Sequence, residues 1–320
     1  MFRSTFIYLS KADWARRLVT RWSVAWRVAS RFIAGEKLND AIRVIQSLNK
    51  KGINATLDHL GEHTTSAEIA RRATIDILEA LDCIHTSGVS SNVSIKLTQI
   101  GIAVDEKLCA ENLVQILQRA KEINNFIRLD IEDSPWVDKT LNLYREMRDV
   151  HGFHNLGVAI QAYLYRSEAD IQHLGEEGTR VRLCKGAYKE PPEIAYPQKA
   201  NVDASYDRLA RILMECSLAI GSPIISDDGI TPPIPSLATH DDRRVKAAVD
   251  YSLKIGLPKK ALEFQMLHGI RRELQESLAA QGYPVRVYVP YGTEWYPYFT
   301  RRLAERPANL WFFISNFFRR

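Results

Sequence analysis

The sequence predicts an α/β protein built as a distorted (βα)8 TIM-like barrel, and two observations support this. Between residues 54 and 290, short apolar runs alternate eight times with longer amphipathic stretches. No second composition block and no linker interrupts the alternation. Strand and helix alternating eight times is the pattern of a closed parallel barrel. A chain of 320 residues is long enough to form such a barrel as one unit.

Each predicted strand is a short apolar run. In order, the runs are 54–58, 93–97, 126–130, 157–161, 181–185, 235–239, 262–266 and 285–289. Between them apolar residues recur with the period of a helix, as in 68–86, 107–124, 137–149 and 242–255. The segment 225–235 is rich in turn-forming residues and predicts a surface loop before the sixth strand.

Residues 1–50 are predicted to form an N-terminal helical arm ahead of a barrel domain at 51–320. Within 1–34, seven basic residues stand against the single acid Asp13, with three tryptophans between them. Scaffold helices explain this pattern, and so do a helix on an anionic membrane surface and a mitochondrial presequence. The aromatic, basic segment 310–320 is expected to pack on the domain, with membrane contact as the alternative.

The composition favours a soluble globular protein, with 25% charged and 46% hydrophobic residues. The formal net charge of +5 is too small and too dispersed to indicate nucleic-acid binding. The four cysteines show no CxxC spacing, which favours a reduced compartment. No apolar run reaches the roughly 18 residues that span a bilayer. We therefore expect a cytoplasmic protein, with peripheral contact at the inner face of the membrane as the alternative.

Polar and charged side chains gather where the predicted strands end. They are Asp58, Lys96, Asp130, Gln161, Arg182, Lys185, Thr239, His240, Gln265 and Tyr288. In a (βα)8 barrel these ends meet at one mouth, where the active site forms. Because an unpaired buried charge is costly, Lys96 and Arg182 need acidic partners or an anionic ligand. Asp58 and Asp130 are the candidate partners.

The segment 59–63, HLGEH, matches the H-x-x-E-H zinc-protease pattern. That pattern requires a helix that brings both histidines to one face. Here the segment follows a strand and contains Gly61, so a loop with Glu62 at the barrel mouth is the better interpretation. We predict no metal site.

The segment 182–193 offers an anion cradle after the fifth strand. Arg182 and Lys185 supply positive charge, Gly186 allows close backbone approach and Tyr188 supplies a flat face. No GxGxxG or Walker-type loop is present, which argues against a Rossmann or P-loop nucleotide site.

The segment 285–310 carries the most specific signal. A β-branched run ends in Tyr288, and an aromatic turn leads into a predicted helix that places Arg301, Arg302 and Glu305 one turn apart. Paired guanidinium groups hold a carboxylate through parallel hydrogen bonds. Aromatic walls beside such a clamp indicate a small, partly apolar amino acid or organic acid as the ligand.

Eight segments together resemble, in order, the signature segments of the monofunctional bacterial proline dehydrogenase family. They are NATLDHLGE, SIKLTQIG, RLDIEDS, IQAYLYRSEAD, RLCKGAY, ATHDDR, FQMLHGI and YVPYGTEWYPYFTRRLAERP. The resemblance implies a barrel whose last helix covers the mouth. It also implies FAD as cofactor, L-proline as substrate, 1-pyrroline-5-carboxylate as product and a quinone as electron acceptor.

The resemblance assigns roles to the matching residues. It implies a carboxylate clamp of Arg301 and Arg302, with Lys96 as a third cation. It implies that the walls of the proline site are Tyr188, Tyr288 and Tyr298. Arg182 would lie near the flavin N5, and Asp130 would belong to the active centre.

The implied flavin contacts are Ile131, Gln161, Arg182, Lys185, Gly186, Ala187, Thr239, His240 and Glu305. Glu62 matches an acid that pairs with the first clamp arginine and gates the site when substrate is absent.

Two other classes of function stay open on the residues alone. A class I aldolase forms a Schiff base on a barrel lysine, and Lys96 or Lys185 could serve. A non-catalytic, membrane-associated barrel fits the basic, aromatic termini but leaves the arginines unexplained.

Overall fold

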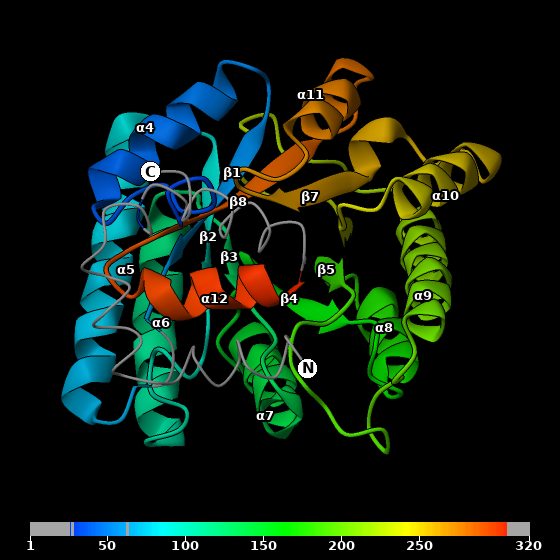
Figure 1. Ribbon diagram of the computed structural model, residues 1–320. Helices are drawn as coiled ribbons and strands as arrows, with labels where there is room; N and C mark the ends of the chain where they lie inside the picture. Colours follow the sequence, from blue (N-terminus) through cyan, green and yellow to red (C-terminus); the bar gives the residue numbers. More distant parts are fainter. Residues whose placement is uncertain (1–25, 27–28, 62–63, 306–320) are drawn as a thin grey trace, which may run out of the picture.

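The computed structural model describes residues 26, 29–61 and 64–305, and the side chains of 301–305 lie outside this description. Eight parallel strands form a closed barrel in chain order, with β8 paired to β1 (Figure 1). The strands are β1 (Asn54–His59), β2 (Ser91–Ile95), β3 (Ile127–Leu129), β4 (Leu156–Gln161), β5 (Val181–Cys184), β6 (Pro235–Ala238), β7 (Glu263–Leu267) and β8 (Val285–Tyr291). The predicted (βα)8 barrel is confirmed, although β2 ends earlier than predicted, so Lys96 follows it directly.

Helices surround the barrel (Figure 1). They are α4 (Leu38–Asn49), α5 (Ala67–Ser87), α6 (Glu106–Glu122), α7 (Ser134–Arg145), α8 (Ser167–Glu176), α9 (Lys199–Ala219), α10 (Asp242–Lys254), α11 (Arg272–Ala280) and α12 (Trp295–Glu305). A π-helical turn at Glu146–Val150 extends α7, and a 3-10 turn at Lys259–Ala261 precedes β7. The four helices predicted from apolar period are present as α5, α6, α7 and α10. Each helix in the described ranges is too short or too polar to cross a membrane.

The strands direct apolar side chains outward and polar ones inward. In β1, Ala55 and Leu57 belong to the apolar core shared with the helices. The alternate residues Thr56 and Asp58 are also buried, and Thr56 Oγ1 donates to Asn92 Oδ1 of β2 at 2.6 Å. Because successive strand residues point to opposite faces, the barrel interior receives a polar set. Buried polar groups must pair with one another, so this interior is a hydrogen-bonded network.

Two helices at the junction of β8 and β1 depart from a regular repeat. The helix that precedes β1, α4, packs outside these strands and buries Ile42 and Ile45 in the core. The last helix, α12, instead crosses the barrel mouth (Figure 1). Its Trp295 and Phe299 pack with Phe32 from the segment before α4. The expectation that the last helix covers the mouth is therefore confirmed.

The domain division at residue 50 stays a prediction, because most of the arm lies outside the described residues. Residues 29–49, which are described, pack against the barrel and against α12. The tail at 310–320 also lies outside the described residues.

The loop 225–235 covers the amino ends of the strands, opposite the mouth. Asp227 and Asp228 are exposed, but Gly229 beside them is buried. The carbonyl of Gly229 accepts a hydrogen bond from Arg286 Nη2 at 2.6 Å, and the carbonyl of Ile230 accepts one from Asn92 Nδ2 at 2.9 Å. Gly229 has φ +72°, and a Cβ there would lie 2.2 Å from a side-chain oxygen of β1. The prediction of a surface loop is only partly right, because the polar barrel interior requires partners at this end.

The apolar layer outside the barrel should dominate stability. We expect Leu57→Ala, at a fully buried site, to lower the free energy of unfolding by about 2–5 kcal/mol. The same change at Leu253, which is 61% exposed, should stay within about 0.5 kcal/mol. Urea unfolding followed by circular dichroism measures both values. Equal losses in the two variants would contradict this account of the core.

Candidate active site

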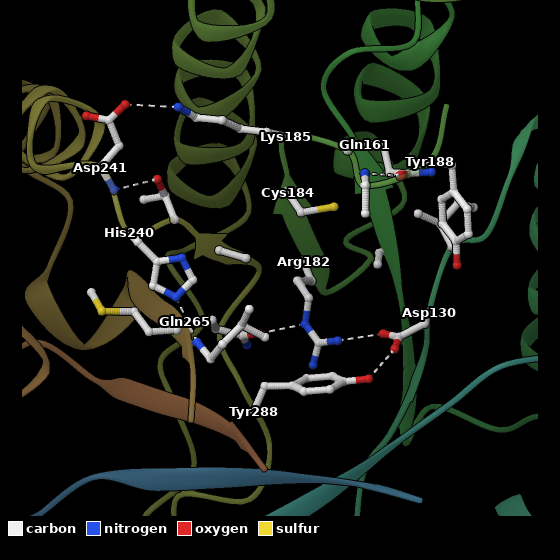
Figure 2. A pocket seen from close by; sticks show the side chains of 18 of the residues that line it. Asp130, Gln161, Arg182, Cys184, Lys185, Tyr188, His240, Asp241, Gln265 and Tyr288 are labelled. Carbon is white, nitrogen blue, oxygen red and sulfur yellow. Dashed lines mark hydrogen bonds and ion pairs between the residues drawn. The ribbon is translucent and has the colours of Figure 1, made fainter. Parts of the chain in front are cut away.

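A cavity of about 650 Å³ opens at the carboxyl ends of the strands (Figure 2). Tyr298 of α12 is among the residues that line it. Its lining includes thirteen of the predicted site residues: Lys96, Asp130, Ile131, Gln161, Arg182, Lys185, Gly186, Ala187, Tyr188, Thr239, His240, Tyr288 and Tyr298. With Asp58 of β1 and Gln265 of β7, which also line the cavity, all eight strands or the loops that directly follow them contribute to one space. A cavity of this size can enclose most of a cofactor or a drug-sized ligand.

Asp130, just after β3, is the centre of an ionic cluster at the floor of this cavity. Arg182 Nη1 lies 2.6 Å from its Oδ1, and Lys96 Nζ lies 3.4 Å from its Oδ2. Ser94 Oγ and Tyr288 Oη each donate to the same carboxylate at 2.7 Å. Four donors from three strands, β2, β5 and β8, or from the residue that directly follows one of them, thus converge on one acid.

These contacts decide the protonation of the cluster. Burial raises the pKa of Asp130, but Arg182, Lys96 and the hydrogen bonds outweigh it, and the pKa lies below its usual value. Burial, followed by the negative charge of Asp130, holds the pKa of Tyr288 well above its usual range. At neutral pH the acid is therefore ionised and the phenol keeps its proton.

Lys96 lies between two carboxylates. Its Nζ donates to Asp58 Oδ1 at 3.1 Å and to Tyr288 Oη at 3.3 Å, in addition to its ion pair with Asp130. Both acidic partners expected from the sequence are thus in place. Lys96 and Arg182 are thus both paired within the protein, and both also line the cavity.

Arg182 is held from three sides. Its Nε donates to Gln265 Oε1 at 2.6 Å, its Nη1 faces Asp130, and its guanidinium carbon lies 5.2 Å from the centre of the Tyr288 ring. Sequence reasoning gave Gln265 no role, although its position at a strand end marked it as a candidate.

Lys185 belongs to a second ionic group, at the rim of the cavity. Its Nζ lies 2.5 Å from Asp203 Oδ1 and 2.9 Å from Asp241 Oδ2. Asp241 also caps α10 by accepting a hydrogen bond from the backbone of Arg243. Lys185 thus ties the end of β5 to the start of α10 beside the cavity (Figure 2).

The loop after β5 lies close to the turn that follows β4. Gly186 has φ +122°, and a Cβ there would lie 2.4 Å from the ring of Tyr163, so glycine is required. The amide of Ala187 donates to Gln161 Oε1 at 3.2 Å, and Gln161 Nε2 donates to the carbonyl of Glu132 at 2.9 Å. The predicted cradle is thus fixed to β4.

Thr239 and His240 follow β6 and face the same space. Thr239 Oγ1 accepts a hydrogen bond from the amide of Asp241 at 3.2 Å. His240 Nε2 accepts one from the amide of Leu267 at 2.9 Å, which puts the proton of the neutral ring on Nδ1.

Four predicted positions lie outside the description. Glu62 is outside the described residues. Arg301, Arg302 and Glu305 belong to α12, but their side chains are not described. On the helix backbone they follow Tyr298 by three, four and seven residues, which are the spacings of one helix face.

A closed parallel barrel with ionisable side chains converging at the carboxyl ends of its strands has the architecture of a (βα)8-barrel enzyme. The family model described as proline dehydrogenase matches residues 41–314. The chain belongs to the proline dehydrogenase family. It is 41% identical over 293 residues to "Proline dehydrogenase" of Deinococcus radiodurans, covering 91% of this chain and 90% of that protein. It is 36% identical over 311 residues to "Proline dehydrogenase 2" of Bacillus subtilis, covering 97% and 96%.

A solved structure shows the same fold within a longer protein. It is proline utilization A (PutA) from Bdellovibrio bacteriovorus inactivated by N-propargylglycine, with a TM-score of 0.79 and 28% identity. The match covers 88% of this chain and 33% of that one. This chain thus spans about a third of the length of the PutA chain.

The ionised state of Asp130 predicts a pH-dependent effect of its removal. Asp130→Asn leaves Arg182 and Lys96 without this carboxylate, which should cost about 3–5 kcal/mol of unfolding free energy at neutral pH. Because the folded-state pKa is lowered, the contribution is present above the ordinary value of 3.8 and disappears as the pH falls below it. Urea unfolding of both proteins across this range measures the difference.

The matched control is Asp250→Asn on α10, where the carboxylate is 58% exposed and pairs with Lys246. It should cost only about 0.3–0.5 kcal/mol at neutral pH. A gap between wild type and Asp130→Asn that stays constant into acid would contradict the ionised state of Asp130.

Proposed function

We propose that this chain is an FAD-dependent proline dehydrogenase that oxidises L-proline to 1-pyrroline-5-carboxylate, the first step of proline degradation. The observation that carries the proposal is the cluster of Lys96, Asp130, Arg182 and Tyr288 in the mouth of a barrel of this family. Two relatives that align over nine-tenths or more of their length bear the name proline dehydrogenase.

The residues of the cavity fit a flavin. Ile131 and Ala238 offer apolar contacts, the backbone of Gly186 forms part of the wall, and Arg182 supplies a positive charge next to the space. Gln161, Thr239 and His240 would hold the ring system, Lys185 and Ala187 the rest of the cofactor, with Glu305 at the edge. When bound, the flavin would take up the hydride from proline C5.

The substrate carboxylate would be held by Arg301 and Arg302. Their positions one turn beyond Tyr298, whose side chain lines the cavity, support this role. Lys96 would provide the third cation from the floor of the site. Such a clamp fixes the orientation of proline when it binds, so less freedom of motion has to be lost in the reaction step.

Aromatic side chains would enclose the proline ring. Tyr288 and Tyr298 line the cavity from the barrel and from α12, and Tyr188 lines it from the loop after β5. Closure over the substrate strengthens the charged contacts because water is excluded. Glu62 would gate this space through an ion pair with Arg301.

Arg182 and Asp130 would act as the catalytic pair. A guanidinium near the site of hydride transfer stabilises the negative charge that develops there. Asp130 is a weak base, because its carboxylate is stabilised by several donors and its pKa is lowered. Its proposed part is to hold Arg182 and the Tyr288 hydroxyl in place.

A quinone is the proposed electron acceptor. We propose that the protein reduces it while in peripheral contact with the inner face of the cytoplasmic membrane. Quinones reside in the bilayer, and the basic, tryptophan-rich residues 1–34 have the composition of a surface-bound helix. The aldolase alternative loses its support, because Lys96 is engaged with two carboxylates and the family is a different one.

The visible spectrum of the purified protein tests the function. We expect a flavin absorbance that disappears when L-proline is added without oxygen, because the bound cofactor becomes reduced. D-proline serves as the control and should leave the colour in place. A protein that binds no flavin, or whose flavin stays oxidised with L-proline, would refute the proposal.

The carboxylate clamp predicts a selective loss of substrate affinity. Arg301→Met should raise the KM for proline about tenfold to a hundredfold, since a charge-assisted hydrogen bond contributes about 1.5–3 kcal/mol. Flavin content should stay at the wild-type level. The same change at Arg43, whose side chain is 72% exposed on α4, is the matched control. An unchanged KM would remove Arg301 from the clamp.

A further inference from the structure

A column of buried side chains crosses the barrel interior from the loop 225–235 to Arg182. Its members are Arg286 of β8, Glu263 and Gln265 of β7, and Arg182 of β5. All four are at most 6% exposed. None of the first three has a part in the function proposed above.

In the lower half of the column, Arg286 forms an ion pair with Glu263 and also donates to backbone carbonyls. Arg286 Nε lies 3.1 Å from both carboxylate oxygens of Glu263, and its Nη2 lies 3.0 Å from one of them. The remaining donors reach the carbonyls of Ala55 at 2.7 Å and Gly229 at 2.6 Å. The loop tip and two strands thus fix the guanidinium, which in turn fixes Glu263.

In the upper half of the column, the side-chain amide of Gln265 connects Glu263 to Arg182. Gln265 Nε2 donates to Glu263 Oε1 at 2.6 Å, and Gln265 Oε1 accepts from Arg182 Nε at 2.6 Å. A carboxylate can only accept and a guanidinium can only donate. The amide therefore has one allowed orientation, and the charge of Glu263 selects it.

Repulsion between buried arginines explains why Arg182 needs a fixed hydrogen-bond partner. Arg128, Arg182 and Arg286 all project into the same buried interior, and burial followed by the charge of Arg182 holds the pKa of Arg128 well below its usual range. Like charges in a low-dielectric interior repel one another. Without a fixed acceptor at its Nε, Arg182 could turn away from the line between Gln265 and Asp130.

We propose that Glu263 and Arg286 are positioning residues that act through Gln265 to fix the Arg182 guanidinium against Asp130. The buried Gly229 anchors this relay through its carbonyl, so the loop 225–235 contributes to a site at the opposite end of the barrel. The catalytic meaning of the relay rests on the proposed function, whereas the position of Arg182 can be measured without it.

The test starts with Glu263→Gln, which keeps the shape of the side chain and removes its charge. The amide at 265 then loses its preferred orientation. The Nε–H signal of Arg182, observed by NMR in the isotope-labelled full-length protein and assigned with Arg182→Lys, should exchange about tenfold faster with solvent. The rate of flavin reduction by L-proline should fall about tenfold, with little change in KM.

The double variant Glu263→Gln/Gln265→Glu separates positioning from simple charge pairing. Arg286 can donate to the new amide oxygen, the new amide can donate to the new carboxylate, and that carboxylate accepts from Arg182. The alternation of donors and acceptors is restored, although Arg286 loses its direct carboxylate partner. We expect both readouts to return to within about threefold of wild type.

Two further variants protect the test from a folding failure. Gln265→Met leaves the Glu263–Arg286 pair intact and should release Arg182 as Glu263→Gln does. Tyr144→Phe removes a buried hydrogen bond to Thr179 at the outside of the barrel and should leave both readouts unchanged.

The relay is overturned if Gln265→Met keeps the wild-type Arg182 signal, or if the double variant performs no better than Glu263→Gln. The proposed function fails in a different way. Wild-type protein would then show no reduction by proline, while the Arg182 signal would still report on the relay.

Discussion

The carboxylate of Asp130, enclosed by Arg182, Lys96 and two hydroxyl donors, is the interaction on which the site depends. A single buried charge would be too costly, and so would two unpaired cations. Together they form a cluster that is stable only because strands from around the barrel end at the same place. The barrel thus brings the opposite charges close enough to compensate one another. The charged centre, in turn, can form only where the barrel is closed.

This constraint extends through the whole interior. The apolar faces of the strands point to the helices, so the inside is filled by groups such as Thr56, Asn92, Glu263 and Arg286 that pair with one another. Their hydrogen bonds end at the loop 225–235, which provides acceptors at the closed end. The open end has no such cover from the strands, and α12 lies across it with Tyr298 in the wall of the cavity.

A site of this kind combines a rigid floor with a separate roof. The floor is made of strand ends, whose positions are fixed by the barrel register. The roof is a helix that packs on Phe32 and Ile33 through Trp295 and Phe299. A carboxylate held from α12 and a flavin held by the floor would meet between the two. This arrangement suits a small amino acid that must be oriented against a large cofactor.

Local patterns in the sequence predicted the barrel, its eight strands and most of the cavity lining, because a period of two or of 3.6 and a polar residue at a strand end are local signals. The family followed from motifs such as RLCKGAY and YFTRR. Which charges meet is a property of the closed barrel: Lys96 lies between Asp58 and Asp130, and Gln265 accepts a hydrogen bond from Arg182. The burial of Gly229 in a turn-rich loop is a second such property. These facts depend on register and closure, which join residues far apart in the chain, and no local pattern encodes them.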